Sequence, residues 1–344
     1  MKTFTSNNKK ITIKDIAKEA GVSTATVSRY INQDSFVEEE KALKIQSVIE
    51  KYNYKPSRLA RGLKIQRTMQ IMLIVPDIKN PYYAKMYDTV QSLASKEKYS
   101  VILYNTNEIA ENEFKAINLV EELNCDGIIF CSVSDNKDII NAMKRLNKPI
   151  VCSSGFDMNS FDTVHGKPPG QGMYIATKYL IECGHKSIAY AGGNPNSILN
   201  TRRYSGYKRA MDEKCIKINK EFYYCNSFTL EGGYQAGEYF YQLKNRPTAI
   251  ACANDMIAIG IMQHFSSHNI NVPNDISIVG MDDIAMSEIV KPRLTTVLND
   301  SSEFASKAIK LLFDRIINGY DGAPREEFCS RKLIKRESVS KLNN

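Results

Sequence analysis

Residues 12–32 read TIKDIAKEAGVSTATVSRYIN, and this stretch decides the fold of the amino-terminal part of the chain. Thr12 followed three residues later by Asp15 predicts the start of a helix, because a threonine hydroxyl can accept a backbone N–H and a carboxylate is favoured in the first turn. Apolar residues recur at helical spacing until Gly21, which ends the helix because glycine adopts the left-handed conformation at low cost. Ser23 is placed to cap a second helix. Two short helices joined by a tight glycine turn predict a helix-turn-helix.

A third amphipathic helix is predicted over residues 38–51, with an apolar side formed by Ala42, Ile45, Val48 and Ile49. Charge is concentrated in the same part of the chain. The first 70 residues hold fourteen Lys and Arg against seven Asp and Glu, whereas the net charge of all 344 residues is +8. A basic amino-terminal module on a nearly neutral body favours a polyanion such as DNA as the partner of that module.

The second predicted helix has an outer face that suits a DNA major groove. Thr24 and Ala25 are short, so the backbone can approach the DNA closely, and Arg29 can reach a guanine edge with two hydrogen bonds. Thr24 can bond a base or touch a thymine methyl, whereas Ala25 offers apolar contact alone. These positions could also be ordinary solvent-facing ones. The coincidence of helix, glycine turn, second helix and basic charge favours DNA binding.

The whole stretch over residues 12–32 resembles the DNA-binding signature of the LacI/GalR family of bacterial regulators. The resemblance implies that Thr24, Ala25 and Arg29 face bases in the major groove. The DNA-binding residues that we predict on this basis are Lys14, Ser23, Thr24, Ala25, Thr26, Ser28, Arg29, Asn32, Tyr54, Ser57, Leu59, Ala60 and Leu63.

Residues 54–64, YKPSRLARGLK, predict a short helix, because Pro56 suits a first turn and one face then carries Leu59, Ala60 and Leu63. This segment resembles the hinge helix of the family, which orders on DNA when two subunits pair, and the resemblance implies that Leu63 wedges between base pairs in the minor groove. Ser57 stands where asparagine is common. Gly62 costs about 1 kcal/mol of helix stability relative to alanine, so we expect a loosely ordered hinge. A plain flexible linker is the alternative, since so short a helix is marginal in water.

From Gln70 onward, short apolar runs alternate with amphipathic segments. We predict strands over residues 71–75, 101–104, 127–131, 150–153, 187–191, 249–253 and 276–279. Helices are predicted over residues 82–95, 113–123, 138–146, 170–183, 203–214, 232–243 and 256–267. Buried strands followed by helices imply parallel sheets, and two such series indicate two α/β subdomains with a cleft between them. Ligands of open α/β sheets bind beyond the carboxyl ends of the strands.

This body resembles the effector domain of the same family, which shares the fold of periplasmic sugar-binding proteins. The matching segments are PDIKNPYY (76–83), ATKYLIECGH (176–185), RYSGY (203–207), AND (253–255), GMDD (280–283) and PRLTTV (292–297). The predicted fold is therefore a three-helix helix-turn-helix domain followed by an α/β effector domain of two doubly wound parallel-sheet subdomains. We assign residues 1–55 to DNA binding, 56–69 to the hinge and linker, and 70–344 to effector binding and dimerisation. The two subdomains are expected at 70–164 with 297–322, and at 165–294 with 323–336.

The resemblance places five residues in the cleft, each just after a strand or at a helix start: Tyr82, Tyr83, Arg203, Asn254 and Asp282. Their chemistry fits a small polar ligand, because aromatic rings stack on sugar or base faces while Arg, Asn and Asp bind hydroxyls. The alternative is that Arg203 and Asp282 form a surface ion pair and the tyrosines belong to the core. Residues 164–170, VHGKPPG, replace an acidic, asparagine-containing stretch that is usual in the family, so we expect a reshaped cleft or subdomain crossing.

Other chemistries find no support in the sequence. The eight cysteines form no CxxC pair, and several lie in apolar runs, as in a reducing compartment. His264 and His268 have a zinc-compatible spacing without a third ligand, and the turn at residues 192–196 lacks the lysine and hydroxyl of a phosphate-binding loop. No catalytic set is evident from spacing, so we expect no enzyme, no metal and no cofactor.

We therefore expect a ligand-responsive, sequence-specific DNA-binding repressor of a sugar-utilisation or related metabolic operon. It would be cytoplasmic, because the first residues form no signal peptide and no apolar run is long enough to span a membrane. It would act as a homodimer on a pseudo-palindromic operator, since the tail at 333–344 lacks leucine heptads, and its effector would be a sugar or sugar derivative. A protein co-regulator, or a solute-binding protein without a DNA role, are the alternatives.

Overall fold

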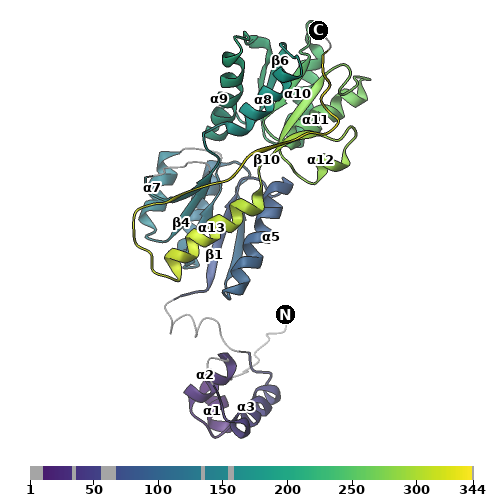
Figure 1. Ribbon diagram of the computed structural model, residues 1–344. Helices are drawn as coiled ribbons and strands as arrows, with labels where there is room; N and C mark the ends of the chain where they lie inside the picture. The colour runs from purple at the N-terminus through teal and green to yellow at the C-terminus, as the bar shows by residue number, and fades with distance from the viewer. Residues whose placement is uncertain (1–10, 33–35, 56–66, 133–135, 154–158, 343–344) are drawn as a thin grey trace, which may run out of the picture. The chain divides into compact units, whose positions relative to one another are not determined.

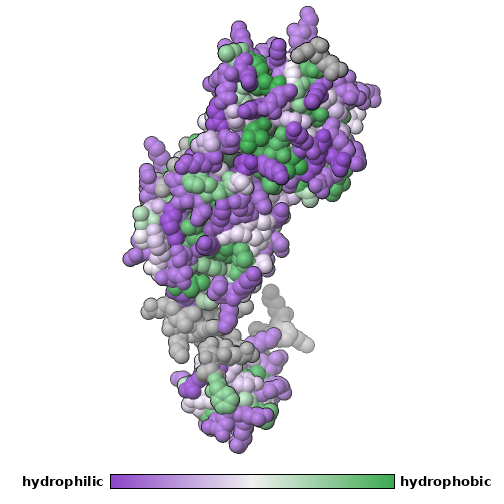
Figure 2. Space-filling model, in the orientation of Figure 1, coloured by the Kyte–Doolittle hydropathy of each residue, from purple (hydrophilic) through white to green (hydrophobic). Residues whose placement is uncertain are grey.

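The computed structural model describes residues 11–32, 36–55, 67–132, 136–153 and 159–342. The chain forms two compact units, Met1–Thr68 and Met69–Asn344 (Figure 1). Hydrophilic side chains cover much of the visible surface of both units (Figure 2). In the described ranges, no helix combines the length and apolar character that a membrane crossing requires.

The amino-terminal unit consists of three helices, α1 (Ile13–Glu19), α2 (Thr24–Asn32) and α3 (Glu39–Lys51). Thr12 and Asp15 form a reciprocal capping box at the start of α1, and Gly21 has a φ of +67° in the turn. The Ser23 hydroxyl accepts a hydrogen bond from the Thr26 backbone N–H at 3.1 Å, which caps α2. The predicted helix-turn-helix is therefore confirmed.

A small apolar core holds these helices together. Ile16 of α1, Val27 of α2 and Ile45 of α3 are each 0% exposed, and Ala17, Ala20 and Val48 complete the cluster. Each fully buried aliphatic side chain contributes roughly 1.5–3 kcal/mol. With so few such residues, the unit depends on each of them.

The first sheet of the second unit contains six parallel strands in the order β11-β5-β4-β3-β1-β2. Their bounds are Gln70–Val75 (β1), Ser100–Asn105 (β2), Gly127–Phe130 (β3), Ile150–Ser153 (β4), Asp162–His165 (β5) and Glu326–Phe328 (β11). Helices α5 (Pro81–Lys96) and α13 (Ser301–Ile316) pack on one face (Figure 1), while α6 (Ala110–Glu122) and α7 (Lys137–Arg145) pack on the other. Successive residues of β1 are therefore buried on alternate faces, which explains its unbroken apolar run.

The second sheet has the order β12-β10-β9-β8-β6-β7, and only its edge strand β12 is antiparallel among the described strands. The strands are Ile188–Gly192 (β6), Tyr223–Cys225 (β7), Ala249–Cys252 (β8), Ser277–Asp282 (β9), Thr295–Leu298 (β10) and Lys332–Ile334 (β12). The helices are α8 (Gln171–Glu182), α9 (Ile198–Glu213), α10 (Leu230–Gln242), α11 (Asp255–Ser267) and the short α12 (Met286–Ile289), with a 3-10 turn at Lys220–Phe222.

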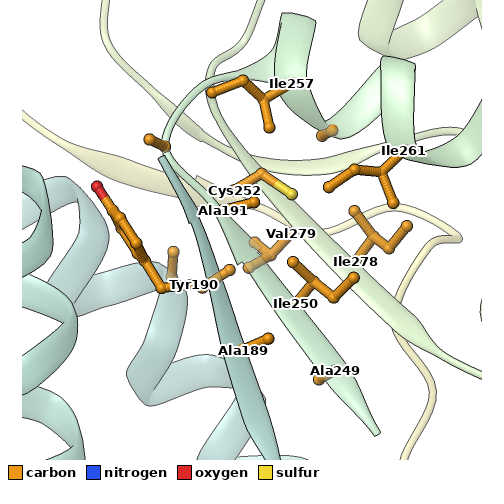
Figure 3. Packing of buried hydrophobic residues seen from close by; sticks show 14 of the residues in the cluster. Ala189, Tyr190, Ala191, Ala249, Ile250, Cys252, Ile257, Ile261, Ile278 and Val279 are labelled. Atoms are coloured by element: carbon orange, nitrogen blue, oxygen red, sulfur yellow. The ribbon is translucent and has the colours of Figure 1, made fainter. Parts of the chain in front are cut away.

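The core of the second sheet lies on both of its faces. Ile257 and Ile261 of α11 lie over Ile250 and its neighbours, whereas Tyr190 projects from the opposite side of β6 (Figure 3). There its ring meets Tyr207 of α9, with ring centroids 5.5 Å apart. The predicted doubly wound arrangement of two α/β subdomains is confirmed.

The chain crosses between the two sheets three times, after β5, after β10 and after β11. These crossings correct the predicted subdomain limits in the returning part of the chain. β10 extends the second sheet to Leu298, whereas we assigned residues from 297 to the first subdomain. β11 at Glu326–Phe328 pairs with β5 in the first sheet, whereas we assigned residues 323–336 to the second. Three-residue edge strands with exposed side chains carry too little periodicity to be located from sequence.

Candidate functional site

The outer face of α2 presents the side chains that were predicted to read DNA. Thr24, Ala25 and Arg29 are exposed, while Val27 on the opposite side is buried in the core. Ser28 is half-buried, and Lys14 is exposed on α1. Helix α2 is thus anchored through Val27 and leaves its outer side chains free to contact another molecule.

Three of the predicted DNA-binding residues also support the local structure. The hydroxyls of Ser23 and Thr26 lie 2.9 Å apart, in addition to the capping bond between these residues. The Tyr54 ring packs on the three-helix core, and burial raises the pKa of its hydroxyl. Asn32 lies in the last turn of α2. The hinge predictions Ser57, Leu59, Ala60 and Leu63 lie outside the described residues.

A surface hollow borders α2 that the sequence did not indicate. Arg29 lines it together with Thr26, Phe36 and Lys41. The Phe36 ring is 89% exposed, and Lys41 forms an ion pair with Glu38 at 2.7 Å. A phenylalanine outside an apolar periodic run gives no sequence signal that distinguishes a surface position from a core one.

In the second unit, Met69–Asn344, here called the effector unit, the first part of the cleft forms where α5 begins beyond β1. The Asn80 side chain caps α5 by accepting the Tyr82 N–H at 3.0 Å. This cap positions Tyr82 and Tyr83 side by side, with ring centroids 5.1 Å apart in an edge-to-face arrangement. Burial raises the pKa of both tyrosines, so their hydroxyls stay protonated and can donate hydrogen bonds.

Arg203 and Asp282 face each other from the second subdomain. The Arg203 side chain is 9% exposed, and its Nη2 lies 3.4 Å from Asp282 Oδ1. Its Nη1 donates to the Ala253 carbonyl at 2.5 Å, and its guanidinium lies 5.3 Å from the centroid of the Phe228 ring. The Nε group is buried without a hydrogen-bond acceptor among the described residues. Arg203 is therefore held in place with one donor still unused.

Asp282 ends β9 in an unusual conformation. Its φ is +120°, which L-residues rarely adopt, and such strain is typical of binding and switching sites. Burial raises the pKa of its carboxyl, while Arg203 and a 3.0 Å hydrogen bond from Asn299 Nδ2 act in the opposite direction. The carboxylate is thus oriented by one residue of α9 and by one residue of a crossing segment.

Asn254 has a supporting part in the same region. Its side-chain oxygen accepts the Ile257 N–H at 2.8 Å and so caps α11. Its side-chain N–H donates to the Phe228 carbonyl at 2.8 Å. Because both ends of the amide bond the backbone, Asn254 fixes α11 and Phe228 beside the cleft.

Asp255 lies directly behind these groups and is completely buried. It accepts hydrogen bonds from the Thr296 hydroxyl at 2.6 Å, the Ser287 hydroxyl at 2.8 Å and the Ile284 N–H at 3.0 Å. Burial and the charge of Asp282 raise the pKa of the Asp255 carboxyl to about 7. These bonds connect α11 with β10, with α12 and with Ile284 in the segment that follows Asp282.

Two hollows meet at the tyrosine pair. The smaller one brings together all five predicted cleft residues, and its lining is Asp77, Asn80, Tyr82, Tyr83, Glu108, Leu199, Arg203, Phe228, Asn254 and Asp282. The larger one shares Tyr82, Tyr83, Leu199 and Arg203 and extends toward the segment at residues 164–173. The cleft is therefore continuous from the ends of β1 and β9 to the first crossing segment.

Several residues that line the smaller hollow were not predicted from the sequence. Asp77 and Glu108 both follow strand ends, and Phe228 precedes α10. The position of Asp77 directly after an apolar run was an available signal. Burial and the neighbouring Asp77 charge raise the pKa of the Glu108 carboxyl to about 7.

The two histidines with zinc-compatible spacing stack on each other. The ring centroids of His264 and His268 are 4.2 Å apart, and His268 Nδ1 lies 2.9 Å from the His264 carbonyl oxygen. Over the described ranges, no group of three or more His, Cys, Asp or Glu side chains could hold a metal ion.

Comparison with known proteins gives two family matches. Residues 12–57 match the model described as "Bacterial regulatory proteins, lacI family", and residues 177–339 match "Periplasmic binding protein-like domain". The chain is 33% identical over 333 residues to the HTH-type transcriptional repressor PurR of Actinobacillus pleuropneumoniae serotype 3 (strain JL03), covering 96% of this chain and 99% of that protein. PurR of Haemophilus influenzae (strain PittEE) is 33% identical over 342 residues with the same coverage.

Solved structures show the same architecture. The lac repressor dimer bound to operator and the anti-inducer ONPF has a TM-score of 0.84 at 23% identity, covering 96% of this chain and 100% of that one. A LacI family regulator from Enterococcus faecium with bound ribose has a TM-score of 0.69 at 26% identity, covering 80% of this chain and 100% of that one. The likeness to the lac repressor concerns the fold of both units.

Proposed function

The chain belongs to the lacI family of bacterial regulatory proteins and is a DNA-binding transcriptional repressor, and we propose that a small molecule bound between its two sheets controls repression. The observation that carries the proposal is that one hollow collects all five cleft residues predicted from sequence. These residues come from both subdomains, so a ligand that contacts them bridges the cleft.

We propose that two subunits present their α2 helices to a pseudo-palindromic operator, as expected for a dimeric helix-turn-helix protein. Arg29 would bond a guanine edge, while Thr24 and Ala25 would contact bases near the helix start. The exposure of these three side chains and the anchoring of α2 by Val27 support this assignment. Leu63 would open the central base step by resemblance to the family.

The effector that we propose is a sugar or sugar derivative. The tyrosine rings offer flat apolar surfaces, while Arg203 and Asp282 are fixed to bond hydroxyl groups. The Enterococcus faecium regulator with bound ribose supports this class. A nucleobase is the competing class, because the same rings also stack on flat heterocycles.

Control of DNA binding would follow from the placement of the ligand. Tyr82 and Tyr83 belong to the first subdomain, whereas Arg203 and Asp282 belong to the second. A ligand that touches both sets binds the closed arrangement more tightly than the open one. It can shift the affinity for the operator only by that difference in affinity.

A thermal-shift screen of sugars and nucleobases on the full-length protein would identify the effector. A ligand present at a hundredfold excess over its dissociation constant should stabilise the protein by about 2.7 kcal/mol. Each hit would then be added to a fluorescence-anisotropy titration of palindromic DNA sites. Absence of sequence preference at moderate salt would contradict operator binding. A bound ligand that leaves operator affinity unchanged would contradict the proposed control.

A further inference from the structure

The larger hollow contains the uncovered start of a helix. Helix α8 begins after Gly170, which has a φ of +74° and no side chain to cap the first N–H groups. The Gln171 N–H bonds the Pro168 carbonyl, but those of Gly172 and Met173 have no acceptor among the described residues. All of these residues line the hollow, and Gly172 and Met173 are buried. Free N–H groups and the helix dipole make such an end a site for anions.

Arginine side chains line the same hollow. Arg202, Arg203 and Arg331 all contribute to its wall, and no Asp or Glu does so among the described residues. The Arg203 side chain is 9% exposed, and its Nε group is buried without an acceptor in the described chain. Arg331 has no carboxylate within ion-pair distance in the described ranges and bonds the Ser330 carbonyl at 2.8 Å. The unpaired Nε group of Arg203 and the guanidinium of Arg331 therefore lie at a cavity that no carboxylate lines among the described residues.

The unusual segment at residues 164–170 makes room for one of these arginines. A Cβ atom at Gly166 would lie 2.9 Å from Arg331 Nη2 and 3.1 Å from its Cζ, so a larger residue there would displace the guanidinium. The following residues of the segment lead directly into the uncapped start of α8. The segment therefore supplies both the space for Arg331 and the free helix end.

From this arrangement we infer that the larger hollow binds an oxyanion, a phosphate or carboxylate group carried by the effector. The inference rests on the proposed function, since it specifies the ligand of the same cleft. Guanidinium groups match the planar pairs of oxygens that both anions offer, and backbone N–H groups at a helix start complete the coordination.

The acidic residues of the smaller hollow determine the orientation of the bound ligand. It carries Asp77, Glu108 and Asp282, of which Asp282 is paired with Arg203. An anionic group is repelled from that end and attracted to the arginine end. The uncharged hydroxyl-bearing or ring portion of the effector then lies at the tyrosine pair, between the two.

The test compares matched ligands on the full-length protein by isothermal titration calorimetry at 150 mM salt. The pairs are glucose with glucose 6-phosphate and ribose with ribose 5-phosphate, together with gluconate and inorganic phosphate. We expect at least one anionic member to bind roughly tenfold or more tightly than its neutral parent, the factor expected of one charge-assisted contact. Phosphorylated sugars and gluconate separate a phosphate site from a carboxylate site.

Variants locate the effect. Arg331→Gln and Gly166→Ala should each reduce the preference for the anionic member roughly tenfold, the first by removing the charge and the second by displacing it. Arg246→Gln, which changes an exposed arginine outside both hollows, should leave the preference intact. Melting temperatures of the ligand-free variants identify any that fail to fold, and the second variant then carries the test.

Equal binding of neutral and anionic members, no binding of any anion, or a preference that survives both variants would overturn the oxyanion site. A neutral sugar that changes operator affinity while its phosphorylated form binds no more tightly would overturn this site and leave the proposed function intact. An anion bound through Arg331 that does not alter operator affinity would support the site and overturn the proposed control.

Discussion

Replacing Arg29 with alanine tests the assignment of α2 as the helix that reads DNA. Arg29 is exposed and forms no ion pair among the described residues, while Val27 holds α2 in the core, so the change should leave the fold intact. Alanine also has the highest helix propensity. A bidentate contact to guanine contributes about 1–3 kcal/mol of discrimination, which corresponds to roughly a 5- to 150-fold loss of affinity for the operator. Affinity for operators already altered at that base pair should change little.

Fluorescence anisotropy with the operator and with single-base variants measures this difference directly. Lys14→Ala is the comparison, because loss of a phosphate contact should weaken binding to all sequences and reduce the salt slope by about one. Lys44→Ala, on the exposed side of α3, should have little effect on sequence preference. A uniform loss of affinity across all base variants for Arg29→Ala would refute the assignment of this side chain to base reading. A large fall in the melting temperature of Arg29→Ala would refute the assignment of the Arg29 side chain to the surface.

Three further perturbations probe the core, the cleft and the pH response. Ile45→Ala should destabilise the amino-terminal unit by about 2–5 kcal/mol and abolish DNA binding, while ligand binding to the effector unit persists in calorimetry. Asp282→Asn removes the counter-charge of buried Arg203, so the free energy of unfolding of the second unit should fall by about 3–5 kcal/mol, seen as a lower melting temperature. The same variant should bind the ligand more weakly in calorimetry. Burial and His268 lower the pKa of His264 in the folded state, so the unfolded state binds more protons below about pH 6.5 and stability should fall as the pH is lowered through this range. His264→Phe should reduce that loss in pH-dependent melting, and an unchanged acid sensitivity would exclude His264 as its source.

Local signals in the sequence were sufficient to predict the helix-turn-helix and the long strands. The capping pair Thr12 and Asp15, the turn at Gly21 and the cap at Ser23 each act within a few residues, so the helix-turn-helix is readable from its own stretch. Apolar runs bounded by polar turns likewise indicated the long strands of both sheets. The caps and the turn depend on the backbone preferences of a few residues, and the strands on a local pattern of apolar residues.

Contacts between residues that are distant in the sequence could not be predicted from such local signals. Arg203 and Asp282 are brought together because β9, β8 and β6 lie side by side in the second sheet, with α9 following β6. The family resemblance placed both residues in the cleft, but their mutual bond and the Ala253 carbonyl beside it depend on strand order. Glu108 entered the cleft for the same reason, since it follows β2 at the edge of the first sheet. Strand order is set by packing of the complete domain rather than by any short segment.

The bonds around Asp282 suggest how ligand contact can reach the crossings between subdomains. Asn299 follows β10 on a segment that leads into α13 of the first subdomain, and its amide donates to the same carboxylate oxygen that faces Arg203. A ligand hydroxyl that bonds Asp282 Oδ1 shares this oxygen with the two donors or replaces one of them. The Asp282 side chain is 4% exposed and is held by donors from α9 and from the crossing segment. A ligand bond to Oδ1 would therefore act on Arg203 and on Asn299, whose segment joins the two halves that the ligand bridges.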